Sequence, residues 1–319
     1  MHACTSLAAM AARATRSASR AASSYDDDDS RCLLLALSHD ELGVIFDGLA
    51  DPLQPVVAVA LSSTCLGLRT PLRAALTVLK ERHARVIVLC REVEMSCAGL
   101  RDAQRLDWSS KSLAAGDMAT LGMILRTTGL PRLRELRVQV NRFGTAGMQA
   151  LCEGLGRGSA LALRILSLSL NGIGPVGAEA LAAALSRGAM AKLEELWLSN
   201  NPIGNQGVAA LAAPLRKLPA LKILTLICCK LDDDGVASLV ANLGKDDFRQ
   251  LERLWLANNK ITDAGCATLS RALDDGVCPA LQILRFGRLV NNPASEAARQ
   301  AVRDALSRAI ARRARARVD

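Results

Sequence analysis

The residues that could carry out chemistry are few and scattered along the chain. Ten cysteines form no Cys-x-x-Cys pair, and the three histidines do not have the spacing of metal ligands. A structural zinc site needs four grouped ligands and a catalytic one at least three. Three consecutive carboxylates, residues 232–234, could hold a cation, but no further ligand set accompanies them, and acids there also favour a helix start. We therefore predict no metal site and no cofactor.

Catalytic motifs are also missing from the sequence. It contains no Gly-x-Ser-x-Gly, no Walker-type glycine-rich loop and no His-Glu-x-x-His. The sequence thus predicts a protein that is not an enzyme. The unpatterned cysteines indicate reduced, mostly buried thiols and an intracellular protein, either cytoplasmic or nuclear.

The elements that would position any site are repeats of about 30 residues. The pattern Leu-x-x-Leu-x-Leu-x-x-Asn-x-Ile occurs five times, with at most two replacements in a copy. Its Asn or Cys position falls at residues 141, 171, 201, 229 and 259, which gives spacings of 30, 30, 28 and 30. In each copy a glycine follows six residues later, and leucines follow ten and fourteen residues later. The alternating leucines predict a short strand, and the later pair predicts a helix that packs over it.

This unit resembles the leucine-rich repeat, and its length is similar to that of the ribonuclease-inhibitor-like class. The resemblance covers about residues 103–310, with a degenerate copy at each end. It implies an α/β solenoid over residues 103–319, a curved horseshoe with about seven parallel strands inside and helices outside. Residues 297–316 are expected to form a capping helix with its arginines on the outer side.

Residues 35–80 have a different, helical pattern. Ser38 is expected to cap a short amphipathic helix that ends before Pro52 and Pro55. Two further apolar helical segments are expected at 56–68 and 72–79.

The order of apolar residues in this region resembles the F-box, a three-helix module that docks onto an adaptor of cullin-type ubiquitin ligases. The resemblance implies that residues 35–68 bind this adaptor through Leu42, Ile45 and Phe46. Two departures are visible, because Ser38 replaces the usual proline and Leu68 lies near a common aromatic position. A plain helical cap for the solenoid therefore remains the alternative.

The N-terminal segment, the net charge and the hydropathy pattern bear on other classes of protein. Residues 1–30 are rich in Ala, Ser and Arg and predict a disordered tail; residues 1–24 also resemble a transit peptide, which is the less favoured reading. The net charge of +9 is spread thinly and comes with no nucleic-acid-binding signature, so a nucleic-acid partner is not expected. No run of about 18 apolar residues is present, and no membrane span is predicted.

The central residue between the two core leucines of each strand is predicted to point away from the core, onto the concave face. Two of the three tryptophans, Trp197 and Trp255, occupy this position and are expected roughly 10 Å apart across Thr225. Trp and Arg anchors are the commonest hot spots of protein interfaces. We therefore predict a protein partner on this face. The partner-binding residues would be Trp197, Trp255, Thr225, Arg253, Arg285, Arg137 and Ile223.

Three functions are compatible with these features. The favoured one is a substrate-recognition adaptor, in which the repeats bind a protein and the F-box-like helices present it to a ubiquitin ligase. The second is a repeat-only binder, inhibitor or sensing protein with a helical cap. The third is a GTPase activator, because the Ran GTPase-activating family uses this repeat class. That family typically carries an acidic tail, whereas residues 312–317 here read Arg-Arg-Ala-Arg-Ala-Arg.

Overall fold

The computed structural model describes residues 38–63, 68, 70–156, 162–240, 247–276, 278–285 and 292–315. The tail and targeting segment expected within residues 1–30 lie outside these ranges. So do residues 64–67 and 316, which belong to two of the expected helices. The described chain begins with helices α2 (His39–Leu49), α3 (Val56–Ser63), α5 (Arg73–Glu92) and α6 (Cys97–Asp102).

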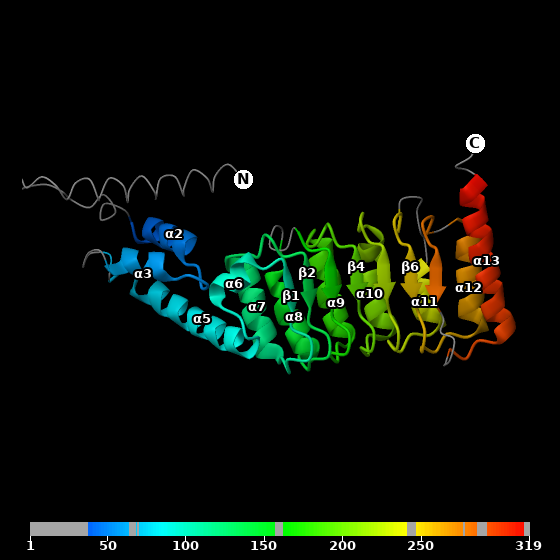
Figure 1. The fold of residues 1–319 in the computed structure, drawn as a ribbon, viewed down its shortest axis with the longest axis horizontal. Helices are drawn as coiled ribbons and strands as arrows, with labels where there is room; N and C mark the ends of the chain where they lie inside the picture. Colours follow the sequence, from blue (N-terminus) through cyan, green and yellow to red (C-terminus); the bar gives the residue numbers. More distant parts are fainter. Residues whose placement is uncertain are drawn as a thin grey trace, which may run out of the picture.

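Strands and helices then alternate along the chain (Figure 1). They are β1 (Arg105–Asp107), α7 (Ala115–Thr127), β2 (Glu135–Arg137), α8 (Gly144–Gly154), β3 (Ile165–Ser167), α9 (Pro175–Ser186), β4 (Glu195–Trp197), α10 (Gly204–Arg216), β5 (Ile223–Thr225), α11 (Asp233–Val240), β6 (Arg253–Trp255), α12 (Asp263–Asp274), β7 (Ile283–Arg285) and α13 (Glu296–Arg315). The seven strands form one parallel sheet in chain order. Since crossovers between parallel strands are right-handed, the helices lie on one side of the sheet. The predicted solenoid fold is confirmed.

The repeated leucines form one continuous core between the sheet and the helices. In the β4 repeat, Leu193, Leu196 and Leu198 are at most 1% exposed, and Leu211 and Leu215 of α10 are equally buried. Burying one leucine stabilises the fold by about 1.5–3 kcal/mol. A single strand–helix unit cannot enclose its own leucines, so the stacking of neighbours provides this burial.

The asparagine that follows most of the strands hydrogen-bonds buried backbone groups. Asn201 is fully buried, and its Nδ2 donates to the carbonyl oxygens of Leu168 and Leu198, both at 2.9 Å. Its Oδ1 accepts from the backbone N–H groups of Asn171 and Ile173, both at 3.0 Å. One amide thus satisfies groups of two successive repeats.

Cys229 takes the asparagine position in the unit of 28 residues. Its thiol contacts the carbonyl oxygens of Leu198 and Ile227 at 3.4 and 3.5 Å, but it has no amide oxygen to offer the preceding turn. The N–H of Ile203 donates instead to the carbonyl oxygen of Asn201, at 2.8 Å. The backbone therefore adapts locally to the missing amide.

The repeated glycine permits the close approach at each helix start. A Cβ on Gly207 would lie 2.5 Å from Cγ2 of Ile203 and 2.9 Å from Cβ of Ala178 in the preceding helix. A Cβ on Gly147 would lie 2.5 Å from Cβ of Phe143. Any side chain here would push the stacked units apart.

The two degenerate copies complete the solenoid as expected. In the β1 copy, Leu106 and Trp108 are at most 1% exposed. In the β7 copy, Asn292 continues the series of asparagines, since its Oδ1 accepts from the N–H groups of Asn259 and Ile261 at 3.1 Å.

Helix α13 has nearly the predicted bounds, and two of its exposed arginines also contact the preceding helix. Arg308 donates to both carboxylate oxygens of Asp274 at 3.0 and 2.7 Å, and Arg312 donates to the carbonyl oxygen of Leu273 at 2.6 Å. Both side chains reach the carboxyl end of α12, where cations satisfy the last carbonyl groups of a helix. The two side chains remain 55% and 49% exposed.

Helix α2 begins as predicted. The Ser38 hydroxyl accepts from the N–H of Glu41 at 3.3 Å, and the Glu41 carboxylate accepts from the N–H of Ser38 at 2.8 Å. This reciprocal pair is a capping box. Leu42 and Phe46 pack in a small apolar cluster with residues of α3 and α5.

Helix α5 is longer than the predicted segment and crosses the boundary expected at residue 80 (Figure 1). Leu79 belongs to the N-terminal cluster, whereas Val86, Leu89 and Cys90 enter the solenoid core. One continuous helix therefore joins the two parts and covers the open side of the β1 repeat.

Candidate functional site

The face of the sheet opposite the helices, hereafter the strand face, carries the candidate binding residues. Trp197 on β4 and Trp255 on β6 are half-buried and pack edge to face, with ring centroids 5.7 Å apart and planes at 77°. Strand spacing alone predicted about 10 Å. The rings are closer because they lean together over β5, where the intervening residue is the short Thr225.

Two predicted contact residues are not exposed on the strand face. Thr225 is fully buried and Ile223 is 8% exposed. The Ser199 hydroxyl donates to the Thr225 hydroxyl at 3.0 Å. The expectation that these residues meet a partner is wrong for this arrangement, because bulkier side chains of the adjacent strands close over them. They support the tryptophans from below.

Arginines flank the tryptophan pair on the side of β6 and β7. The guanidinium of Arg285 lies 5.3 Å from the centroid of the Trp255 ring, a cation–π distance. Arg253, two residues before Trp255 on the same face of β6, is also exposed. We call Trp197, Trp255, Arg253 and Arg285 the Trp–Arg patch.

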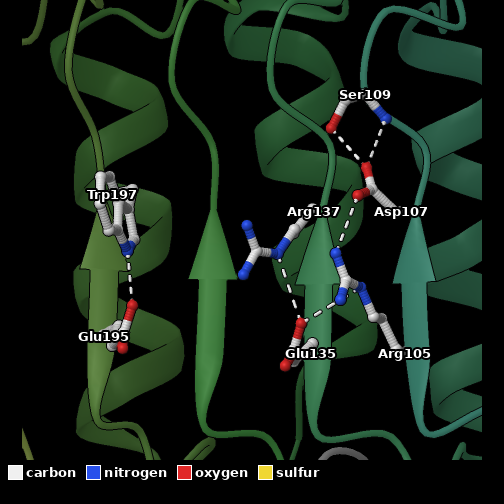
Figure 2. Close-up of polar contacts among 7 residues, drawn as sticks. All are labelled: Arg105, Asp107, Ser109, Glu135, Arg137, Glu195 and Trp197. Atoms are coloured by element: carbon white, nitrogen blue, oxygen red, sulfur yellow. Dashed lines mark hydrogen bonds and ion pairs between the residues drawn. The ribbon is translucent and has the colours of Figure 1, made fainter.

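The two indole N–H groups of the patch differ. Trp197 Nε1 donates to the carboxylate of Glu195 at 3.0 Å, as Figure 2 shows. Trp255 Nε1 is buried and, within the described part of the chain, has no acceptor. A buried donor without an acceptor is unfavourable.

The other half of the strand face is an ion-pair network (Figure 2). Glu135 lies 3.4 Å from Arg105 and 3.3 Å from Arg137, and Arg105 lies 3.3 Å from Asp107. Hydrogen bonds from Ser109, and the nearby Arg105, hold the pKa of Asp107 below its ordinary value. Arg137, predicted to bind a partner, is therefore already engaged by a neighbouring carboxylate.

Sequence reasoning missed Arg105, Glu135 and Glu195 as part of this face. A signal was present, because the strand register pairs Arg105 with Glu135 and Asp107 with Arg137. Opposite charges one repeat apart occupy neighbouring positions in a sheet of this kind. Comparing charges across successive repeats would have found the network.

The three consecutive carboxylates at 232–234 have structural partners. Asp233 accepts from the N–H groups of Thr262 and Gly265 at 2.8 and 3.0 Å, and so caps the following helix, α12. Asp232 bonds to Asn205 of the preceding repeat. No cluster of three or more His, Cys, Asp or Glu side chains suited to a metal occurs among the residues with described positions.

The described thiols are unpaired and mostly buried. Burial raises the pKa of Cys152, Cys229 and Cys278 to about 12. Because the thiolate is the nucleophile, these groups are unreactive near neutral pH. The Sγ atoms of Cys90 and Cys97 are 3.8 Å apart.

The predicted adaptor-binding residues do not form an exposed patch. Leu42 and Phe46 are 4% and 1% exposed, and Ile45 is half-buried. The first two are the core of the N-terminal cluster, so the expectation that they contact a partner directly is wrong. The exposed apolar residues of α2 and α3 are Val44, Val56 and Val57.

Comparison with known families agrees with the geometry. A leucine-rich repeat family model matches residues 162–182, 189–212 and 249–270, each of which contains parts of a strand–helix unit. No curated protein matches the sequence. The fold defines a repeat solenoid of alternating parallel strands and helices. The matched segments are leucine-rich repeats within this solenoid, and repeats of this kind support a role in protein–protein interaction. None of the described helices is long and apolar enough to span a membrane.

Proposed function

We propose that this protein is a binding scaffold whose protein partner docks on the Trp–Arg patch. The observation that carries the proposal is the half-exposed Trp197–Trp255 pair on the strand face. Trp and Arg side chains are enriched among the few residues that dominate interface energies. Thr225 fixes the rings from below, so the anchor is formed before the partner arrives.

Binding is favoured over catalysis by the chemistry of the described residues. The buried thiols have raised pKa values, and the acidic side chains at helix starts are occupied by backbone N–H groups. A general acid or base needs a free group near the reacting atoms. The Trp–Arg patch offers contact area and charge instead.

The test is cross-linking of the intact protein, followed by mass spectrometry of the captured chains. The Trp197→Ala/Trp255→Ala double variant is compared with the parent and with Val176→Ala. Val176 is an exposed residue of α9, on the helix side. We expect the parent and the control to capture the same partners and the double variant to lose them. Equal capture by all three would place the binding site elsewhere.

We also infer that the N-terminal helices bind an adaptor of a cullin-type ubiquitin ligase, as the F-box resemblance implies. Val44 of α2 is 70% exposed, and Val56 and Val57 of α3 are 67% and 52% exposed. Exposed apolar residues on neighbouring short helices favour docking against another helix. In this form of the proposal the valines make the contact and Leu42 and Phe46 hold the helices in place.

The competing function of this region is to cap the solenoid, which the continuous α5 favours. A Val44→Asp/Val56→Asp variant separates the two, with Val88→Asp, an exposed position of α5, as control. Loss of adaptor and cullin from the purified protein, with unchanged thermal stability, supports the adaptor function. If the parent and control preparations contain neither adaptor nor cullin, the adaptor function is contradicted and capping is the only remaining function of this region.

The repeat subclass and the location are parts of the same proposal. Strand–helix units of 28 to 30 residues favour the ribonuclease-inhibitor-like class. Unpaired, buried cysteines favour a reducing intracellular compartment, cytoplasmic or nuclear.

A further inference from the structure

A column of residues with left-handed backbone runs along the carboxyl ends of the strands. In the repeats of β1 to β6 the residue just before the asparagine position has a φ between 54° and 59°. These residues are Ser110, Val140, Leu170, Asn200, Cys228 and Asn258. Asparagine tolerates this conformation best among residues with side chains, whereas a β-branched residue is a genuine outlier there. Val140 and Leu170 are therefore poorly suited to their positions.

Burial does not compensate for this strain. Val140 is 47% exposed and Leu170 is 48% exposed. They lie on adjacent repeats at the same level, because their N–H groups donate to the carbonyl oxygens of Ser169 and Ser199 at 3.0 Å. Strained residues that persist without a packing role are typical of functional sites. Two exposed apolar side chains, where asparagine would be less strained, indicate contact with a partner.

The charges of the strand face differ between its two halves. The carboxylates and arginines of β1 and β2 are paired with one another. The outward positions of β5 to β7 hold no acid: they are Ile223, Thr225, Arg253, Trp255, Ile283 and Arg285. Within the described ranges, Arg253 and Arg285 therefore have no carboxylate partner. Arg285 is held against the Trp255 ring, which leaves its N–H edge free for a bidentate carboxylate.

Building on the proposed docking function, we propose that the strand face binds an extended segment of a partner protein with an apolar half and an acidic half. The apolar half contacts Val140 and Leu170, and the acidic half places carboxylates on Arg253 and Arg285. Strands β2 and β7 are five strand steps apart, which corresponds to about 24 Å. Roughly seven extended residues cover this sideways distance, and the segment must run obliquely because Val140 lies three residues beyond the end of β2.

Single-stranded nucleic acid is the competing ligand for Trp and Arg groups. Tight phosphate binding needs a row of cations along the backbone. Glu135 and Glu195 instead line the path between β2 and β4, and among the outward positions of the seven described strands only those of β6 and β7 carry arginines without a carboxylate partner. The charge distribution thus favours a segment that is acidic at one end only.

The test titrates the full chain with fluorescein-labelled peptides that carry leucine and phenylalanine in one half and glutamate in the other, made in both orders. Glutamine replaces glutamate in a matched peptide, and a single-stranded oligonucleotide is the third probe. We expect at least about tenfold weaker binding of the glutamine peptide. Arg253→Gln and Arg285→Gln should give similar losses, whereas Arg271→Gln, an exposed arginine of α12, should not. Equal affinity for both peptides, no binding of the acidic peptide, or tighter binding of the oligonucleotide overturns the proposal.

Asparagine variants test the apolar half. Val140→Asn and Leu170→Asn should keep or raise the melting temperature, because asparagine relieves the strain, while probe affinity falls about fivefold or more. Val176→Asn, equally exposed on α9, is the control and should bind as the parent does. Unchanged affinity of the Val140 and Leu170 variants contradicts the proposal. If the double tryptophan variant loses its cross-linked partners while these arginine and asparagine variants keep them, the scaffold function stands and this inference falls.

Discussion

The amide oxygen of Asn201 accepts a hydrogen bond from the backbone N–H of Ile173, 3.0 Å away in the preceding repeat. The same asparagine donates to the carbonyl oxygen of Leu168, also in that repeat. Successive repeats are therefore joined by side-chain-to-backbone bonds as well as by leucine packing.

Asn201→Ala should lower the free energy of unfolding by about 3 kcal/mol or more, because it leaves several buried backbone groups without partners. Chemical denaturation monitored by circular dichroism measures the change. Gln206→Ala, at an exposed position of α10, is the control and should shift stability by less than about 0.5 kcal/mol. Similar losses in both variants would contradict the role of the buried amide.

Gly207→Ala should destabilise the protein by about 2 kcal/mol, because the added Cβ overlaps side chains of Ile203 and of Ala178 in the preceding helix. Gly116 of α7 has open space around its Cβ position. Gly116→Ala should therefore stabilise the helix by about 0.5–1 kcal/mol. Melting temperatures that move in opposite directions support the close-approach explanation, and a harmless Gly207→Ala would refute it.

Asp263 gives stability a defined pH dependence. The N–H and hydroxyl of Ser295 donate to its carboxylate at 2.6 and 2.9 Å, and these bonds hold its pKa below the ordinary value. A carboxyl with a lowered pKa in the folded state stabilises above its unfolded pKa of about 4, and this contribution disappears as the pH falls through the folded value.

The Asp263→Asn variant should thus be less stable than the parent at neutral pH, and the difference should shrink as the pH falls below about 4. Denaturant midpoints across this range measure it. Asp275→Asn, an exposed carboxyl at the other end of α12, should show a smaller difference at neutral pH. If the stability difference between Asp263→Asn and the parent were the same at all pH values, the charge of Asp263 would not contribute to stability.

Trp197→Ala and Trp255→Ala should each weaken partner binding by about 2 kcal/mol or more. Each should also lower stability by about 1 kcal/mol, because the two rings pack on each other. In a double-mutant cycle the stability losses should not add, since either substitution removes the same ring contact. Calorimetric binding and thermal unfolding of the three variants measure both effects. Additive stability losses would show that the rings do not depend on one another.

The sequence by itself determined the strands, the helices and the leucine core. In a solenoid each unit contacts only its neighbours, so a period of 30 in the sequence becomes a fixed step in space. The strand register follows directly from this step. Leu196, Asn201 and Gly207 therefore occupy the same positions in their repeat as the matching residues do in the other repeats. The capping box at Ser38 and Glu41 was equally readable, because it depends on residues three apart.

Only the tertiary structure decided which side chains remain accessible. The alternation of side chains along each strand places Thr225 and Trp255 on the same face of the sheet. Whether a short side chain there stays exposed depends on the size of the side chains beside it. The two indoles lean across Thr225 and bury it. Likewise, the helical period of α2 identifies Leu42 and Phe46 as apolar, but α3 and α5 decide that this face is covered. Periodicity reports the direction of a side chain from its own backbone, whereas exposure is set by neighbours that come from elsewhere in the chain.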